Sequence, residues 1–225
     1  MEVGLVAQPG WDPRRLNAVA VRLPDGTTPP GTRGRILHSA LKLFAEFGYH
    51  GTSIRDIAAG VGINSATLYS HYPSKEQILA ELVLLGHEQL HKQLQEALAE
   101  AGTDPVRQLA ALVRTQVLVH ADFPLLALVA NQETHALSRE CAAPALAVRE
   151  QSRDLARQVL EAGVRQKVFD TDDVTLTQVA ISSMGIRVAS WFGPDQPYTR
   201  DQIADAFVRY ALRVAGAVSA PATGG

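Results

Sequence analysis

The sequence of 225 residues has few of the features that mark exported or membrane-bound proteins. Its single cysteine, Cys141, has no partner for a disulfide within the chain, which favours a reducing, cytoplasmic setting. Its start lacks the basic residues and apolar core of a signal peptide, and no apolar run approaches the ~20 residues of a membrane-spanning helix. No stretch alternates apolar and polar residues as a half-buried β-strand does. We therefore expect a cytoplasmic, all-α protein with no membrane partner.

The net charge of −2 is too small to indicate a nucleic-acid-binding protein, but the charges are unevenly distributed. Residues 31–78 contain five Lys or Arg against three acidic residues, a balance of +2. Residues 79–225 contain thirteen against seventeen, a balance of −4. A basic segment attached to an acidic remainder favours DNA contact at one end of the molecule only.

The spacing of apolar residues at three and four positions predicts helices from Thr32 onward. Ser53, with an acidic residue three positions later, is typical of a helix start with a capping box, and Asn64 is a good N-cap for the next helix. The turn between these two short helices contains Gly62. The expected helices span residues 32–48, 53–61, 64–71, 74–101, 104–121, 124–138, 142–168, 172–192 and 200–217, with a joint at Cys141–Pro144.

Residues 52–72 meet the geometric requirements of a helix-turn-helix. A small residue, Ala58, lies where the two helices nearly touch, and Gly62 supplies the unusual backbone angles of the turn. Leu68 of the second helix packs back against the first helix. The opposite face of the second helix must be small and polar enough to enter the major groove of DNA. The residues on that face are Ser65, Ala66, Thr67 and Tyr69.

The segment FAEFGYHGTSIRDIAAGVGINSATLYSHYPSKEQIL closely resembles the N-terminal domain of the TetR family of bacterial transcriptional repressors. The resemblance covers about residues 32–85 and implies nine helices in all, of which the first three bind double-stranded operator DNA. It also implies a C-terminal domain that forms a homodimer and holds a small-molecule inducer. The hallmarks are Phe44, Phe47-Gly48, Thr52-Ser53, Ile57-Ala58, Val61-Gly62-Ile63, Leu68-Tyr69, His71-Tyr72 and Ser74-Lys75-Glu76.

The resemblance also assigns roles in DNA binding to individual residues. Thr52 suits a phosphate contact because the backbone N–H groups at a helix start attract anions. For Tyr69 the alternative is a half-buried packing ring, and for His71 it is a cap or a packing role. Ser65 and Ala66 are too short to read many bases directly. The implied DNA-binding residues are Thr52, Ser53, Arg55, Ser65, Ala66, Thr67, Tyr69, His71 and Lys75.

We divide the chain into four parts by composition and helical pattern. Residues 1–30 are rich in proline and have no sustained period, so we expect a flexible N-terminal arm. Its Arg14, Arg15 and Arg22 are interpreted as part of a solvated tail rather than as DNA contacts. The other parts are the helix-turn-helix domain at residues 31–78, a ligand-binding and dimerisation domain at residues 79–220 and a loose tail at residues 221–225.

The last two expected helices carry small and apolar residues on single stripes, which suits close packing against a second copy. A dimer also places two DNA-binding units on two half-sites of one operator. The stripes consist of Val174, Ile181, Val188, Ala189 and Phe192, and of Ile203, Ala204, Phe207, Val208, Ala211, Leu212 and Ala215.

The effector cavity is expected among the fifth to eighth helices, where polar or aromatic residues interrupt apolar stretches. Arg187 has two interpretations, a clamp on an acidic ligand group or a partner for an acid across the dimer. For Trp191 we favour a packing role over a place in the cavity wall. The candidate ligand-binding residues are His120, Phe123, Asn131, His135, Arg187 and Trp191.

The sequence Trp191-Phe192-Gly193-Pro194 resembles the corresponding region of regulators of fatty-acid or steroid breakdown that sense acyl-CoA thioesters. We therefore expect an apolar or amphipathic ligand, such as an acyl-CoA.

His87 and His91 have the spacing of a two-histidine metal face, but no third ligand can be placed, and we interpret both as solvated surface residues. Neither a metal nor a cofactor is expected.

The sequence predicts a repressor that a ligand releases from its operator, with an activator or a ligand-independent DNA-binding protein as the alternative. An enzyme on a helical bundle is disfavoured, because the sequence has no paired nucleophile and base, no acid–histidine cluster and no phosphate-binding loop.

Overall fold

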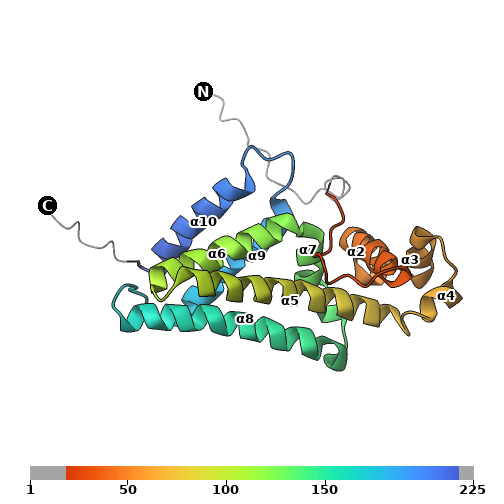
Figure 1. Ribbon diagram of the computed structural model, residues 1–225, viewed down its shortest axis with the longest axis horizontal. Coiled ribbons are helices and arrows are strands. Elements are labelled where there is room, and N and C mark those ends of the chain that lie inside the picture. The colour runs from red at the N-terminus through yellow and green to blue at the C-terminus, as the bar shows by residue number, and fades with distance from the viewer. Residues whose placement is uncertain (1–18, 218–225) are drawn as a thin grey trace.

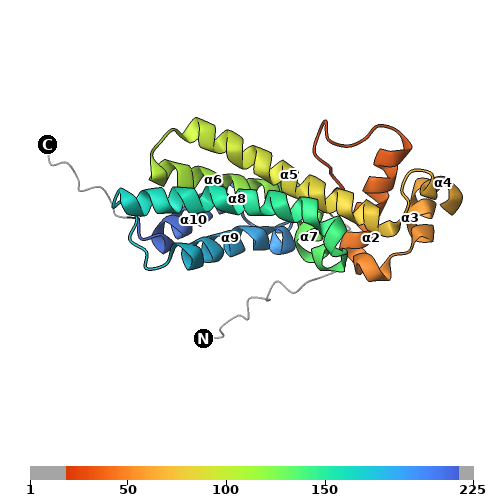
Figure 2. The same cartoon turned by 90° about the horizontal axis from the view of Figure 1, so that it is seen from below.

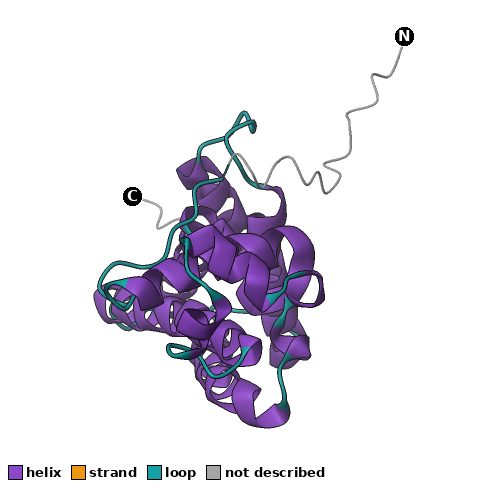
Figure 3. Ribbon diagram, turned by 90° about the vertical axis from the view of Figure 1, so that its right-hand side faces the viewer, coloured by secondary structure: helices purple, strands orange, loops and turns teal. Residues whose placement is uncertain are grey.

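The computed structural model describes residues 19–217, and within that range every regular element is a helix. Figure 3 shows the helices joined by loops, with no strand among them. This confirms the all-α prediction. The elements are α2 (Thr32–Gly51), α3 (Ile54–Val61), α4 (Ser65–Tyr69), α5 (Lys75–Ala101), α6 (Pro105–Asp122), α7 (Pro124–Gln132), the short 3₁₀ helix η1 (Thr134–Ala136), α8 (Arg139–Arg165), α9 (Val174–Trp191) and α10 (Arg200–Val214).

The helices form two parts, which we call the head (α2–α4) and the bundle (α5–α10). Figure 1 shows the head at one end and α5 leaving it to run along the bundle, where it packs against α6 and α8. α6 also packs along α10. The short α7 contacts both α2 and α5, and in Figure 2 it lies where the head meets the bundle. Two elements, α5 and α7, therefore connect the parts.

Side-chain caps begin α3, α4 and α5 where the sequence predicts them. Ser53 and Asp56 form a reciprocal capping box at the start of α3, and Asn64 Oδ1 accepts the Thr67 N–H at 2.8 Å. Ser74 Oγ accepts the Gln77 N–H at 3.2 Å. α4 ends at Tyr69, two residues before the predicted end, because its last turn tightens and the His71 N–H donates to the Leu68 carbonyl.

The predicted joint at Cys141–Pro144 is wrong, because these residues lie inside α8. That helix begins one turn earlier, where Ser138 Oγ accepts the Cys141 N–H at 3.3 Å. Pro144 is exposed and close to the helix start, where its missing N–H costs a single backbone bond. The break falls instead between α7 and α8, at η1, so the predicted helix 124–138 is split.

One continuous core joins the head to the bundle. It contains fully buried side chains of the head, such as Phe44 and Leu68, together with Leu79 of α5 and Val129 of α7. The predicted boundary at residues 78 and 79 therefore falls inside a helix and inside one core. Leu23, in the described part of the predicted arm, is buried in the same core. Arg14, Arg15 and the predicted tail 221–225 lie outside the described residues.

Among the described residues, no single helix is long and apolar enough to cross a membrane. Only α6 and α7 taken together reach the required length and apolarity, and they are bent by 103° at the break between them. The residues from Leu125 to Ala130 of α7 are buried within the protein.

Candidate functional site

The turn between α3 and α4 is held by backbone geometry that requires glycine. Gly62 has φ of 75° and ψ of 33°, in the left-handed region that other L-residues rarely adopt. The Ile63 N–H donates to the Ala58 carbonyl at 3.0 Å and the Gly62 N–H to the Ala59 carbonyl at 3.1 Å, which is the pattern of a Schellman motif. No atom lies within 4 Å of the position of a Cβ on Gly62, so backbone conformation and not crowding selects glycine.

The packing of α4 against α3 leaves one face of α4 exposed. Leu68 is fully buried against Ile57 and Ala58, as predicted. On the other side Ala66 is exposed and Tyr69 has 51% of its surface accessible, while Ser65 and Thr67 are half-buried. Arg55 of α3 is exposed as well. This surface is rigid, because its backbone is fixed by caps at both helix starts and by the Gly62 turn.

We correct the prediction that Thr52 contacts a DNA phosphate. Its side chain is almost entirely buried, and its hydroxyl bonds to the carbonyls of Gly48 at 2.9 Å and Leu43 at 3.2 Å. These bonds close the corner between α2 and α3, so the hydroxyl does not face solvent. Ser53 is exposed, but its hydroxyl is engaged with Asp56, and that hydrogen bond holds the pKa of the Asp56 carboxyl below its usual value.

Lys75 ties the same corner to the start of α5. Its ammonium donates hydrogen bonds to the carbonyls of Tyr49 at 2.7 Å and Thr52 at 2.6 Å, and lies 4.1 Å from the centre of the Tyr49 ring. Partial burial lowers the pKa of Lys75. Two of its three donors are therefore occupied within the protein, which leaves one for a phosphate. His71, also in the predicted set, is half-buried in the turn after α4.

Two carboxylates form polar links around η1, one with the head and one between α5 and the segment before α8. Glu133, just after α7, accepts the backbone N–H of Tyr49 in α2 at 3.1 Å. Glu76, in the first turn of α5, accepts the backbone N–H of Ser138 at 2.6 Å, and this bond lowers the pKa of Glu76. Glu133 is therefore a direct polar contact between the head and the segment that follows α7.

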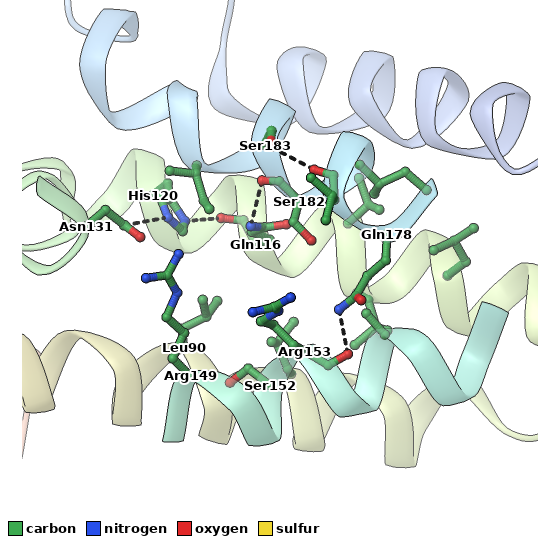
Figure 4. Close-up of a pocket in the computed structure, with 18 of the residues that line it drawn as sticks. Leu90, Gln116, His120, Asn131, Arg149, Ser152, Arg153, Gln178, Ser182 and Ser183 are labelled. Carbon is green, nitrogen blue, oxygen red and sulfur yellow. Dashed lines mark hydrogen bonds between the residues drawn. The ribbon is translucent and has the colours of Figure 1, made fainter. Parts of the chain in front are cut away.

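The bundle encloses a cavity of about 300 Å³ between α5, α6, α8 and α9, with α7 at one end. Its size is at the lower limit of typical small-molecule sites. Figure 4 shows the polar side chains that reach into it from opposite walls. The lining residues are His87, Leu90, Leu94, Leu109, Leu112, Val113, Gln116, His120, Asn131, Arg149, Ser152, Arg153, Ala156, Leu160, Gln178, Val179, Ile181, Ser182, Ser183 and Ile186.

Two arginines of α8 give the cavity a positive charge. In Figure 4 the side chains of Arg149 and Arg153 point from α8 toward α6 and α9. No acidic side chain is among the lining residues. Arg153 has a partner outside the cavity, Glu150 at 3.3 Å, whereas in the described part of the chain no acid lies within ion-pair distance of Arg149. A cavity with apolar walls and two cations suits an amphipathic anion.

His120 and Asn131 form a hydrogen-bonded pair at the α7 end of the cavity. His120 Nδ1 bonds to the Gln116 carbonyl at 2.8 Å, which assigns its proton to Nδ1 and leaves Nε2 as an acceptor. Asn131 Nδ2 lies 3.5 Å from that Nε2 and donates to the Ala127 carbonyl at 2.8 Å. Burial lowers the pKa of His120 to about 4, so the ring is neutral near pH 7.

The predicted ligand-binding residues divide into two groups. His120 and Asn131 line the cavity, and Phe123 lines a hollow of about 20 Å³ that adjoins it. His135, Arg187 and Trp191 do not line it. His135 is exposed on η1, Arg187 lies on the exposed side of α9, and the Trp191 ring stacks on Phe207 with ring centres 6.5 Å apart.

The prediction of a solvated surface position is wrong for His87, which is 6% exposed and lines the cavity. Its place on the apolar stripe of α5, between Val83 and Leu90 at steps of four and three, is a signal that identifies a buried position. Arg149 has a similar place between Ala145 and Ser152 on α8. Eight polar lining residues were not predicted from the sequence, namely His87, Gln116, Arg149, Ser152, Arg153, Gln178, Ser182 and Ser183.

The stripes predicted to pair with a second copy are largely buried within the protomer, as Ile181, Val188 and Ala211 show. These side chains pack on α6 and on the other bundle helices, because α9 and α10 must first complete their own core. Other residues of the same two helices, mostly spaced three or four positions apart, remain exposed to solvent. They are Leu176, Val179, Ala180 and Ser183 on α9, and Tyr210 and Val214 on α10.

Comparisons with known proteins agree with both parts of this architecture. Residues 36–82 match the family of bacterial regulatory proteins called the tetR family, and residues 102–215 match the tetracyclin repressor-like C-terminal domain. The HTH-type transcriptional repressor KstR2 of Rhodococcus jostii (strain RHA1) is 30% identical over 190 residues, which cover 84% of this chain and 93% of that protein.

Solved structures show the same fold. A bacterial regulatory protein of the tetR family from Rhodococcus RHA1 has a TM-score of 0.80 at 29% identity, covering 85% of this chain and all of that one. AibR in complex with isovaleryl coenzyme A and operator DNA has a TM-score of 0.72 at 27% identity, covering 78% of this chain and 95% of that one. The chain is therefore a member of the TetR family, a family of DNA-binding transcriptional regulators and not of enzymes.

Proposed function

We propose that this protein is a repressor that binds operator DNA through the exposed face of α4 and is released by an amphipathic anion bound in the bundle cavity. The observation that carries the DNA-binding part is the rigid α3–α4 corner, which presents Arg55, Ala66 and Tyr69 to solvent. With only short side chains at Ser65 and Ala66, much of the affinity comes from phosphate contacts and from DNA shape. A protein with this role works in the cytoplasm, where its operator is.

We propose a homodimer as the active form. The exposed stripe of Leu176, Val179 and Ser183 on α9, with Tyr210 and Val214 on α10, supplies the small and apolar surface that a helical interface needs. Two copies related by a two-fold axis place two heads on the half-sites of a pseudo-palindromic operator. Sedimentation velocity at micromolar concentration tests this, and a monomer at all concentrations would contradict it.

The effector that we propose is an acyl-CoA or a related amphipathic anion. Arg149 and Arg153 supply the positive charge for its anionic part, and the leucines of α5 and α6 supply the apolar wall for its acyl part. The similarity to AibR, whose structure contains isovaleryl coenzyme A and operator DNA, supports this class of ligand.

The link from cavity to head runs through α5 and α7. Asn131 lies on the cavity wall, and Glu133, two residues further on, holds the Tyr49 N–H of the head. A ligand that binds better to one arrangement of α7 shifts the head toward the position that this arrangement allows. In the dimer, that shift changes the separation of the two α4 helices and so the fit to the operator.

A gel-shift assay with the DNA upstream of the protein's own gene tests the proposal. We expect retardation by the wild type and about a ten-fold or greater loss of affinity in Tyr69→Ala, because one contact at the DNA surface is removed. Tyr198→Ala is the matched control, since Tyr198 is similarly exposed but lies outside the head. Equal retardation by wild type and Tyr69→Ala would contradict the role of α4.

The effect of a ligand separates a repressor from the two alternatives. We expect decanoyl-CoA to raise the melting temperature and to release the operator, because it binds the DNA-free state preferentially. Stronger DNA binding with the ligand, together with increased transcription in vitro, would indicate an activator. No change in stability or DNA binding with acyl-CoAs of any chain length would favour a ligand-independent protein.

A further inference from the structure

The α7 end of the cavity contains a buried nitrogen atom that has no partner in the described part of the protein. His87 is 6% exposed, and its Nε2 is buried with no hydrogen-bond partner. The nearby His120 has its Nδ1 bonded to Gln116 and its Nε2 next to Asn131. A buried polar atom without a hydrogen bond destabilises the folded protein, because it has lost its contact with water and gained none in return. The cavity thus has one unsatisfied position on an otherwise hydrogen-bonded polar wall.

The position of His87 makes it accessible to a ligand. It lines the main cavity and also the adjoining small hollow, together with Leu90, His120 and Asn131. These residues form the wall between the two spaces. A group that reaches this end of the cavity, furthest along α5 toward the head, meets the His87 ring.

We propose that His87 is a specificity-determining residue, which hydrogen-bonds an uncharged oxygen, a hydroxyl or a ketone, on the acyl part of the effector. This inference rests on the proposed effector cavity and refines its ligand class to oxygenated acyl chains. The anionic part of the same ligand is held by Arg149 and Arg153 of α8.

The electrostatics favour a neutral oxygen over a second anion at this position. Burial, with the positive charges of Arg149 and of His120 when protonated, lowers the pKa of His87 to about 4, against a smaller opposing effect of a hydrogen bond between the ring and the Ala130 backbone. The ring is therefore uncharged near pH 7 and offers one donor and one acceptor nitrogen. A carboxylate bound to this ring would lose its hydration, and the neutral ring would not form an ion pair with it.

Binding of three CoA thioesters to the full-length protein, measured by titration calorimetry, tests this inference. The probes are decanoyl-CoA, 10-hydroxydecanoyl-CoA and 9-oxodecanoyl-CoA, which have similar acyl chains. We expect one of the two oxygenated compounds to bind the wild type about three- to ten-fold more tightly than decanoyl-CoA. A preference for the ketone would assign the proton of His87 to Nε2, since a ketone only accepts.

Two variants of His87 and one control sharpen the test. In His87→Leu the preference should disappear, and decanoyl-CoA should bind at least as tightly as to the wild type, because the unsatisfied nitrogen is replaced by apolar surface. His87→Gln, which retains a donor and an acceptor, should retain part of the preference. Lys92→Leu, on the exposed side of α5 and outside the cavity lining, should retain all of it.

The outcomes distinguish this inference from the proposed function. Equal affinity of the wild type for all three thioesters, or the same preference in wild type and His87→Leu, would overturn the role of His87 and leave the acyl-CoA effector standing. Binding of none of the three would overturn the acyl-CoA effector, and the His87 subsite with it.

Discussion

The head and the cavity differ in how their polar groups are satisfied. In the head, Ser53, Asn64 and Thr52 each bond to backbone or side-chain atoms within nine residues. In the cavity, His87 Nε2 has no partner in the described chain, and Arg149 has no acid nearby. The polar groups of the α3–α4 corner are therefore satisfied locally, and the head offers a fixed surface to its partner. The cavity retains a positive charge and an unsatisfied hydrogen bond, which a ligand can meet.

The two regions nevertheless share one core. Leu68 of the head and Val129 of α7 belong to the same buried cluster, and α7 also contributes Asn131 to the cavity. The head packs against α7, which forms part of the wall of the ligand site. A movement of that wall is therefore expected to move the head as one rigid body. The polar groups of the cavity are left for a ligand to satisfy, and the shared apolar core connects the cavity with the head. Both features suit a regulator that is controlled by a ligand.

The largest expected effect concerns the shared core. Leu68→Ala removes a fully buried side chain, and we expect the free energy of unfolding in urea to fall by about 2–5 kcal/mol. Because the core is continuous, circular dichroism and tryptophan fluorescence should report one common transition at a lower urea concentration. Leu146→Ala, on the exposed side of α8, is the control and should cost at most about 0.5 kcal/mol. Two separate transitions would show that head and bundle unfold independently.

The second effect is a dependence of stability on pH, which the buried histidines of the cavity produce. The pKa values of His87 and His120 are about 4 in the folded protein and rise to about 6.5 on unfolding. The unfolded chain therefore binds more protons between these values, and stability present above pH 6.5 is lost as the pH falls. From pH 7 to pH 5 we expect a loss of roughly 2 kcal/mol for each histidine.

Urea unfolding at pH 7 and pH 5 measures this loss. In His87→Leu the loss on acidification should be smaller by roughly 2 kcal/mol, because one titrating group is removed. Leu126→Ala, a core change without a titrating group, should lower stability by the same amount at both pH values. An unchanged pH dependence in His87→Leu would show that its ring titrates in the folded protein as it does in the unfolded chain.

The smallest effect tests the link between the two regions. Glu133→Ala removes the acceptor of the Tyr49 N–H, and we expect the change in operator affinity caused by decanoyl-CoA to fall by about 0.5–2 kcal/mol. Fluorescence anisotropy of labelled operator DNA, with and without the thioester, measures it. Affinity for decanoyl-CoA itself should remain close to that of the wild type, because Glu133 does not line the cavity. Glu140→Ala, an exposed acid on α8, is the control, and an equal response in both variants would exclude this link.

The sequence predicted the head better than the cavity for a definite reason. Each cap acts over three residues, as Ser53 with Asp56 and Asn64 with Thr67 show, so its partner can be read from the sequence. The exceptions are Thr52, at the start of α3, and Lys75, at the start of α5, whose partners lie across the α2–α3 corner. Their hydrogen bonds follow from how α2, α3 and α5 meet, whereas the family resemblance implied a phosphate contact for both.

In the cavity the contributing residues are far apart in sequence. His120 and Asn131 were predicted as interruptions of apolar stretches, but the same criterion also selected His135 and Arg187, which point elsewhere. His87 was missed because it was interpreted, like His91, as a solvated surface residue, and Arg149 was not among the candidates because nothing in its local sequence distinguishes it from a surface arginine. Their places on apolar stripes of α5 and α8 identify them as inward-facing once those stripes are known to meet.

The sequence by itself determined where α3, α4 and α5 begin, where the Gly62 turn lies and which side of α4 is buried. These features depend on interactions within one or two helical turns and on backbone conformations that few residues adopt. Only the tertiary structure decided that Thr52 is internal, that α7 joins the head to the bundle and that His87, His120 and Arg149 face one cavity. Side chains from separate helices meet only after the apolar stripes have packed, and that packing fixes which polar groups share a space and which one is left without a partner.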